Sequence, residues 1–254
     1  MHIVFARTRP GVILRALCWV LVAQTASVSA QTRHSLSLGK EVAVFGTGFM
    51  FHGLSLVQAR RPMPTLQWPL DATGLPGIDR RVVGNWDPGA HRASNVLFGV
   101  AAATSLATAL LVQGGEEPMV PVVILFQSGL IASGITNVVK EAVRRPRPYL
   151  YDPDVPPSLH HGHDDQMSFW SGHTASTAAL TFTTANLVQH SDASQGVKTA
   201  TWISAATLPA AMGWLRVRAG RHFITDVVTG YVFGALVGWA VPYIHRTTYK
   251  QHTP

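Results

Sequence analysis

The hydrophobic positions of this chain lie in long continuous blocks. Six blocks share this character, and they cover about residues 42–57, 94–112, 119–139, 174–188, 200–217 and 227–244. None of them alternates polar and apolar residues as a half-buried strand does, and their lengths favour helices. The pattern therefore predicts an all-α protein, a helical bundle of about six apolar helices.

Several blocks are also rich in small residues, as in the run from Gly99 to Ala107. Small residues let helices approach closely, which membrane bundles require. The block 119–139 is uncharged and long enough to span a bilayer, and the block 227–244 is near the lower limit of length. The block 174–188 is short and threonine-rich, and it would also suit the core of a soluble bundle. A membrane-embedded bundle is favoured, with a soluble or peripheral all-α domain as the alternative.

Composition narrows the class of protein further. Of 254 residues, 47% are hydrophobic and only 13% are charged, with a mean hydropathy of +0.18, which excludes a disordered chain. The single cysteine, Cys18, excludes a disulfide scaffold. The net charge of +7 favours an anionic partner, either a membrane surface or a phosphorylated substrate. Nucleic acid is not expected, because the sequence contains no nucleic-acid-binding module.

The first thirty residues have the layout of a secretory signal. Basic residues in 1–15, an apolar stretch at 16–23 and small residues at 27–30 follow one another. Cleavage after Ala30 would remove Cys18 and three of the 20 basic residues, which leaves 17 basic against 13 acidic residues and a net charge of +4. The alternative is an uncleaved anchor. We divide the chain into a signal peptide (1–30), an N-terminal apolar segment with a polar linker (31–93), a catalytic core (94–246) and a C-terminal tail (247–254).

Three polar clusters lie at the ends of the predicted helices, and the first spans residues 140–148. Pro146 disfavours helix at Arg145, so the helix should end there. Arg147 is then held in an extended stretch between two prolines, with Lys140 about two turns back on the helix. A lysine and a rigid arginine fork at one helix end suit a phosphate clamp. The alternative is a basic loop that anchors the helix end at lipid headgroups.

The second cluster is the Ser171-Gly172-His173 sequence at the start of a predicted helix. Ser171 is a good N-cap, and Gly172 lets a ligand approach the backbone N–H groups, which bind anions at a helix start. His173 in the first turn could exchange a proton with such an anion. A capped helix that begins with an unrelated histidine would have the same sequence.

The third cluster contains Arg216, His222 and Asp226. His222 and Asp226 are four positions apart, so on a helix their side chains would share one face. A carboxylate there can hold one imidazole nitrogen and make the other more basic, while Arg216 binds an oxyanion. The alternative is an ordinary His–Asp pair on a helix surface.

The order and spacing of these clusters closely resemble the type 2 phosphatidic-acid phosphatase superfamily, which also contains bacterial acid phosphatases and vanadium haloperoxidases. The shared pattern is lysine, six residues and Arg-Pro, then Ser-Gly-His, then arginine, five residues, histidine, three residues and aspartate. The resemblance covers about residues 94 to 244. Trp170 stands where the family usually has proline and Leu215 where it usually has serine. Neither replaces a chemical group, although Trp170 is expected to reshape the pocket rim.

The resemblance implies a role for each motif residue. His222 would be the nucleophile that forms a phosphohistidine, oriented by Asp226, and His173 would be the general acid and later the base that activates water. The groups implied to bind the phosphoryl oxygens are Lys140, Arg147, Ser171, the Gly172 N–H and Arg216. These cations occupy the role that a magnesium ion often plays, so no metal and no other cofactor is expected.

The function implied is hydrolysis of a phosphate monoester or pyrophosphate, of a lipid in preference to a small phosphate ester. Two alternatives stay open. One is a vanadate-dependent haloperoxidase, in which His222 would coordinate vanadate, and the other is a catalytically silent lipid-binding membrane protein of the same fold. The run 160–165 carries three histidines and two aspartates, but it has no metal-ligand spacing and is expected to be a solvated loop.

The resemblance also implies a location in the bacterial cell envelope, embedded in the membrane with the active site facing the periplasm. With a cleaved signal, this orientation requires that the block 42–57 lie at the membrane surface without spanning it. Five arginines between Arg60 and Arg92 favour the opposite orientation by the positive-inside rule.

Overall fold

Six long helices form the structure, a computed structural model that describes residues 34–67, 69–112, 119–152 and 162–247. The long helices are α2 (Leu38–Ala59), α4 (Pro88–Leu111), α5 (Val120–Val143), α6 (Gly172–Gln189), α7 (Gln195–Arg218) and α8 (Ile224–Ile244). Short turns of helix are α3 (Gly77–Arg80), η2 (Pro148–Tyr151) and η4 (His163–Gln166). Each predicted apolar block coincides with one long helix, so the predicted all-α bundle is confirmed. The signal peptide predicted for residues 1–30 lies outside the described residues.

Local sequence signals explain several helix ends. Asp87 caps α4 by accepting a hydrogen bond from the Ala90 N–H at 2.9 Å, and Pro88 occupies the first turn. The helix predicted to stop before Pro146 ends at Val143, where Arg144 takes a left-handed conformation with φ of 48°. Arg144 is held there because its guanidinium donates to the carbonyl oxygens of segment 58–62 and of α5.

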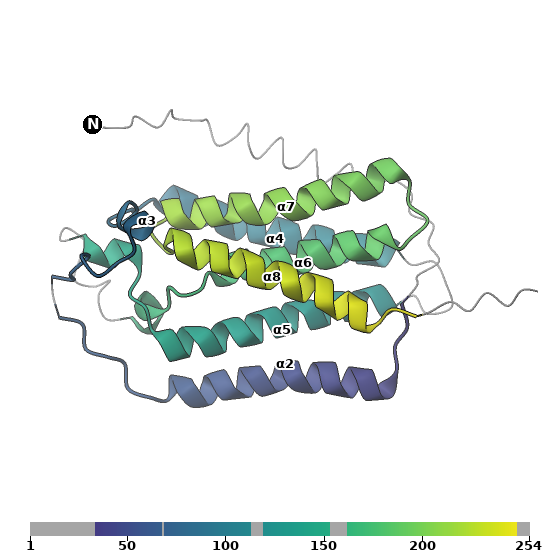
Figure 1. Ribbon diagram of the computed structural model, residues 1–254, viewed down its shortest axis with the longest axis horizontal. Helices are drawn as coiled ribbons and strands as arrows, with labels where there is room; N and C mark the ends of the chain where they lie inside the picture. The colour runs from purple at the N-terminus through teal and green to yellow at the C-terminus, as the bar shows by residue number, and fades with distance from the viewer. Residues whose placement is uncertain (1–33, 68, 113–118, 153–161, 248–254) are drawn as a thin grey trace, which may run out of the picture.

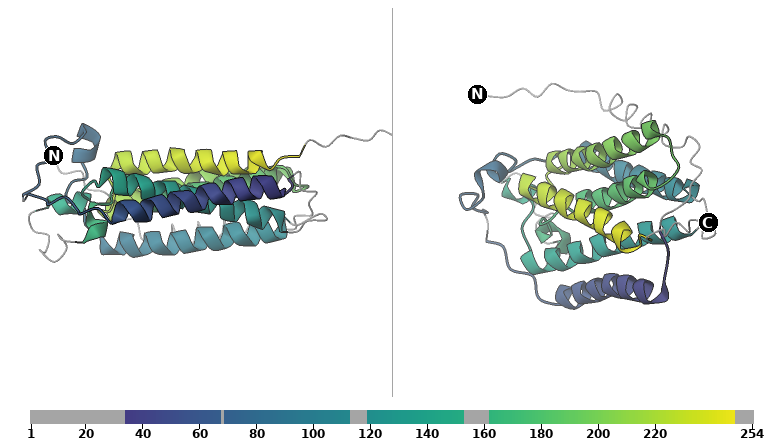
Figure 2. Two further views of the ribbon diagram at one scale, coloured as in Figure 1. Left: turned by 90° about the horizontal axis from the view of Figure 1, so that it is seen from below. Right: turned by 45° about the vertical axis from the view of Figure 1, so that its right-hand side comes forward.

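Successive long helices run in opposite directions along one axis (Figure 1). Helix α6 occupies the centre and packs against α4, α5, α7 and α8, whereas α2 lies at the edge against α5 (Figures 1 and 2). The C-terminal ends of α5 and α7 and the N-terminal ends of α4, α6 and α8 therefore meet at one end of the bundle, beside α3. We call this the α3 end.

The closest helix contact joins α6 and α8. Glycines recur at every fourth residue of α8 and face small residues of α6; the glycines are Gly230, Gly234 and Gly238, and the residues facing them are Ser171, Ala175 and Ala179. A Cβ atom at Gly234 would lie 2.1 Å from the carbonyl oxygen of Ala175, closer than any real contact. The two backbones therefore touch, as small residues permit in membrane bundles.

Four of the described helices are long and apolar enough to cross a membrane, namely α2, α4, α5 and α8. Their outer faces carry large exposed apolar side chains, as on α2, where Leu56 is 68% exposed. Such faces suit lipid contact, so the chain has the character of a membrane protein. Helix α2, which contains the block 42–57, lies lengthwise against α5. The expectation that this block lies at the membrane surface stays a prediction.

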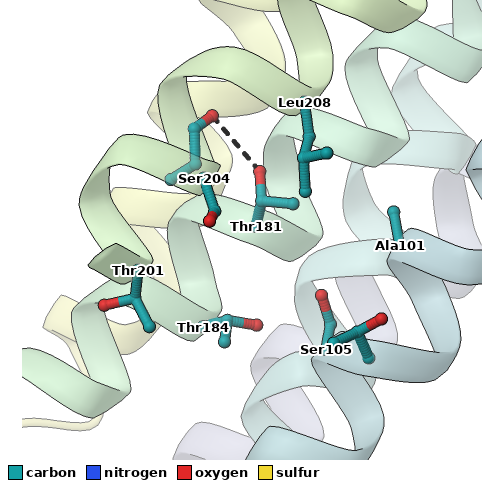
Figure 3. A pocket seen from close by; sticks show the side chains of 9 residues that line it. Ala101, Ser105, Thr181, Thr184, Thr201, Ser204 and Leu208 are labelled. Atoms are coloured by element: carbon teal, nitrogen blue, oxygen red, sulfur yellow. Dashed lines mark hydrogen bonds between the residues drawn. The ribbon is translucent and has the colours of Figure 1, made fainter. Parts of the chain in front are cut away.

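The threonine-rich face of α6 borders a small hydroxyl-lined cavity of about 10 Å³ between α4, α6 and α7 (Figure 3). Thr181 and Thr184 donate to carbonyl oxygens one turn earlier on α6, and Ser204 does the same on α7. These hydroxyls thus form hydrogen bonds within their own helices, which offsets the free-energy cost of burying them in an apolar bundle. No residue of the three predicted clusters lines this cavity.

The contact between α6 and α8 predicts how the bundle responds to one added methyl group. Gly234→Ala should lower the thermal unfolding midpoint in detergent, because the new Cβ must push α8 from α6, and overpacking costs about 1–3 kcal/mol. Gly99→Ala on α4 is the matched control, since nothing lies within 4 Å of its Cβ position. This control should keep or raise the midpoint. Equal midpoints for the two variants would contradict the contact.

Candidate active site

All three predicted clusters meet at the α3 end. Lys140 lies in the last turn of α5, Ser171 and His173 at the start of α6, Arg216 in the last turn of α7, and His222 just before α8. The Lys140 ammonium lies 3.7 Å from the position that a Cβ of Gly172 would occupy, so the first and second clusters are in contact. Sequence positions up to 86 residues apart, from 140 to 226, thus come together at one site.

His222 is buried, with 1% of its side chain exposed. Its Nδ1 lies 2.6 Å from the Ser168 carbonyl oxygen, which can only accept, so Nδ1 carries the proton and Nε2 is unprotonated. Nε2 lies 3.5 Å from Nη1 of Arg147. The ring therefore presents an unprotonated nitrogen beside a cation.

The spacing predicted that Asp226 and His222 share one helix face, and this prediction is wrong. Helix α8 begins at Ile224, so His222 lies before the helix. The Asp226 carboxylate is 3.8 Å from His222 Nδ1, beyond hydrogen-bond distance. It accepts instead from the Phe223 N–H at 2.8 Å and from the Ser168 hydroxyl. Asp226 thereby caps α8 and fixes the Ser168 segment, so it orients His222 through the Ser168 carbonyl.

Arg145 and Asp79 complete this support, and neither residue belongs to a predicted site motif. Arg145 donates to Asp226 at 2.6 Å and to Asp79 at 2.8 Å, with its guanidinium 4.0 Å over the Phe223 ring. Asp79, on α3, is fully buried and also accepts from the Thr225 N–H at 3.0 Å. A buried ion-pair network of this kind fixes the positions of its side chains, because any movement that separates the partners leaves a buried charge without its counter-charge.

Arg147 is 2% exposed and held from several sides. Its guanidinium donates to the Asp164 carbonyl oxygen and carboxylate, both at 2.7 Å, and to the Arg221 carbonyl oxygen at 2.7 Å. Asp164 belongs to the run 160–165, which was expected to be a solvated loop. Residues 163–166 form the turn η4 in the connection between α5 and α6, and the Asp164 side chain is 68% exposed, so this part of the run is solvated as expected, although Asp164 also braces Arg147.

The other two cations have donors to spare. Arg216 is 3% exposed, and its Nη1 lies 3.1 Å from Nδ1 of His91 and 3.2 Å from the Ser94 hydroxyl. Its Nε is buried and has no hydrogen-bond partner within the described part of the chain. Lys140 likewise has no hydrogen bond to any residue that the structure describes. These donors are available to an anion in the pocket.

Ser171 is the N-cap of α6, as predicted, and accepts from the Thr174 N–H at 3.4 Å. His173 follows in the first turn, with Nε2 3.1 Å from the Asn95 side-chain oxygen and its ring 5.3 Å from the Phe98 ring. Asn95 and Phe98 lie on α4, so this helix positions His173 at the pocket. Neither residue belongs to a motif that sequence reasoning could use.

Burial and, after it, the local charge keep both histidines neutral. Burial first, and then Arg147, Arg216 and Lys140, hold the pKa of His222 well below its usual value. Burial and the charges of Arg216 and Lys140 lower the pKa of His173 to about 3. Two neutral imidazoles among three cations form a pocket that favours an anion with more than one negative charge.

The two departures from the family pattern have structural roles. Trp170 donates its indole N–H to the Thr136 hydroxyl at 2.7 Å on α5, and its ring lies 4.6 Å from the Phe233 ring on α8. Trp170 therefore ties α5 to α8. Leu215 packs against a buried cluster that includes Leu97 and Met212.

No group of three or more His, Cys, Asp or Glu side chains arranged for a metal ion occurs among the described residues. The metal-independent chemistry expected from the cation cluster therefore remains a prediction.

Comparison with known proteins gives a family and a solved structure. No curated protein matches the sequence significantly. The chain is similar to the first transmembrane PAP2 type phosphatidylglycerolphosphate phosphatase from Bacillus subtilis, a crystal structure, with 20% identity over 81% of this chain and 95% of that chain and a TM-score of 0.47. A model of the PAP2 superfamily matches residues 121–250, just over half of the sequence and including all three motifs. The chain therefore belongs to the PAP2 superfamily, as the order of its motifs indicated.

Proposed function

We propose that this protein is a metal-independent phosphatase that hydrolyses a phosphate monoester or pyrophosphate of a lipid through a phosphohistidine at His222. The observation that carries the proposal is the unprotonated Nε2 of His222, which accepts a long hydrogen bond of 3.5 Å from Arg147 in a buried cluster of cations. Phosphoryl transfer needs positioning and charge neutralisation above all, and this cluster supplies both.

In the first step, Nε2 of His222 attacks phosphorus and the bond to the leaving oxygen breaks. Lys140, Arg147 and Arg216, with Ser171 and the Gly172 N–H, neutralise the phosphoryl oxygens. The imidazole becomes positively charged as the N–P bond forms. The Ser168 carbonyl oxygen at 2.6 Å and the Asp226 carboxylate at 3.8 Å stabilise that charge.

His173 donates a proton to the leaving oxygen in this step. In the free pocket the nearby cations keep His173 unprotonated, and a bound phosphoryl dianion offsets their charge, so substrate binding itself favours the protonated acid. In the second step His173 takes a proton from water, which attacks the phosphohistidine and releases inorganic phosphate.

A lipid substrate is supported by the position of the pocket. Four helices have the length and apolar character of membrane spans, and the cations lie at the end of the bundle where these helices end. A phosphate group at the surface of a bilayer would lie at this level.

We further propose that the α3 end faces the periplasm of a bacterial envelope. Residues 34 and 246 pair at the opposite end of the bundle. If all six long helices span, a periplasmic pocket requires residue 34 to be cytoplasmic. A cleaved signal at residues 1–30 and an outward pocket then exclude each other.

The nucleophile is tested by His222→Ala. Phosphate release from phosphatidic acid and from p-nitrophenyl phosphate, measured with a metal chelator and no added metal, should fall by more than about 1000-fold. His190→Ala, a histidine at the opposite end of the bundle, should keep the wild-type rate. Activity that survives His222→Ala, or that requires magnesium, would overturn the mechanism. Vanadate should inhibit the wild type without oxidising bromide, which separates a phosphatase from a haloperoxidase.

The general acid is tested by the leaving group. His173→Ala should lower the hydrolysis of an alkyl phosphate by about 10²–10⁴-fold, because an alkoxide needs a proton to leave. The loss should be much smaller for p-nitrophenyl phosphate, since p-nitrophenolate leaves without one. Equal losses for both esters would show that His173 has only a structural role.

The orientation is tested by single cysteines in a Cys18→Ser background. Thr73→Cys lies on an exposed loop beside α3, and Gln195→Cys is exposed at the start of α7, at the other end. A membrane-impermeant maleimide should label Thr73→Cys in intact spheroplasts and Gln195→Cys only after the membrane is permeabilised. The reverse pattern would place the pocket in the cytoplasm.

A further inference from the structure

Arg221 is a fourth cation at the pocket, and no motif assigns it a role. It directly precedes His222, and its backbone carbonyl accepts from Arg147 at 2.7 Å. Its side chain is 19% exposed, whereas Arg147 is 2% and Arg216 is 3% exposed. Arg221 is therefore more accessible to solvent than Arg147 and Arg216.

Two aromatic rings hold the Arg221 guanidinium. It lies 5.2 Å from the Tyr149 ring centre and 5.6 Å from the Trp86 ring centre, and these rings contact each other at 5.1 Å. Tyr149 is itself fixed, because it is buried and its hydroxyl donates to Asp165. Stacking orients the planar guanidinium without using its N–H donors.

Arg221 is only weakly engaged by the residues around it: it forms a long ion pair with Asp164, and its Nε donates no hydrogen bond within the described residues. The Asp164 carboxylate is committed to Arg147 at 2.7 Å, and its other oxygen is 3.7 Å from Arg221, outside hydrogen-bond distance. Nε of Arg221 is buried and has no partner in the portion of the chain that the structure describes. A buried guanidinium N–H without an acceptor is costly unless a ligand supplies one.

We propose that Arg221 binds the second phosphoryl group of a lipid pyrophosphate, so that the pocket selects pyrophosphates over monoesters. This inference rests on the proposed phosphatase function. Lys140, Arg147 and Arg216 serve the terminal phosphoryl group beside His222, and a pyrophosphate places its second group one bridging oxygen further out. A planar fork of N–H donors matches the oxygens of that group.

The reaction balances with this assignment. His222 Nε2 bonds to the terminal phosphorus, and the bond from that phosphorus to the bridging oxygen breaks. The electron pair stays on the bridging oxygen of the departing lipid monophosphate, which takes a proton from His173, and Arg221 stabilises the negative charge that remains on that phosphate. Water then cleaves the phosphohistidine, so one pyrophosphate and one water give one lipid monophosphate and one inorganic phosphate.

The test compares farnesyl pyrophosphate with farnesyl phosphate, which differ only in the second phosphoryl group. Wild type should show the higher kcat/KM for the pyrophosphate. Arg221→Met keeps the apolar stem between the rings and should lower kcat/KM for the pyrophosphate by about 10–100-fold, as expected for a lost charged hydrogen bond. For the monophosphate, kcat/KM should change less than about threefold, because this substrate lacks the second phosphoryl group that Arg221 would bind. Arg221→Lys should recover part of the loss.

Arg218→Met is the matched control. Arg218 also stacks on an aromatic ring, Trp214 at 5.0 Å, but it is 49% exposed and bonded to Asp87 at 2.7 Å. This variant should leave kcat/KM unchanged for both farnesyl substrates. If Arg221→Met does not fold, inhibition of the wild-type enzyme provides the test. Inorganic pyrophosphate should then inhibit hydrolysis with a lower inhibition constant than inorganic phosphate.

The outcomes separate the two proposals. Equal losses for both farnesyl substrates in Arg221→Met, or equal inhibition by pyrophosphate and phosphate, would overturn the role of Arg221 and leave the phosphatase intact. A wild type that hydrolyses neither substrate would overturn the proposed function itself.

Discussion

The backbone contact between α6 and α8 is the constraint on which the pocket depends. His173 begins one of these helices and His222 immediately precedes the other, so their separation follows from how closely the helices approach. Glycines at every fourth residue of α8 remove the side chains that would keep the backbones apart. The Ser171 N–H also donates to the Asp226 carbonyl oxygen at 3.1 Å, which joins the two helix starts directly. The acid and the nucleophile are thus brought together by packing.

Burying several arginines at one end of an apolar bundle is costly unless their charges are partnered. Arg145 and Arg147 meet this cost with Asp79, Asp226, Asp164 and backbone carbonyls. Arg216 and Lys140 are left with free donors, as is Arg221. The division separates cations that hold the structure from cations that can hold a ligand. It explains how the site is held by ion pairs and is still complementary to an anion.

The direction of α2 links the pocket to the topology of the chain. A helix packed lengthwise along α5 places residue 34 at the end opposite His222. If α2 spans the membrane, cleavage of residues 1–30 therefore determines which side of the membrane the pocket faces. Neither the arginine distribution nor the layout of residues 1–30 alone could show that coupling.

The sequence by itself determined the six helices, the N-cap at Ser171 and the family, because apolar periodicity, capping chemistry and motif spacing are local properties. It also placed the candidate phosphate-binding and catalytic residues at helix ends. Only the tertiary structure decided that Ser168, and not Asp226, is the direct partner of His222, since α8 starts two residues too late for a shared helix face. It alone showed Arg145, Asp79, Asp164 and Arg221 around the pocket. Their roles come from contacts between segments as far apart as residues 79 and 226, which no local pattern encodes.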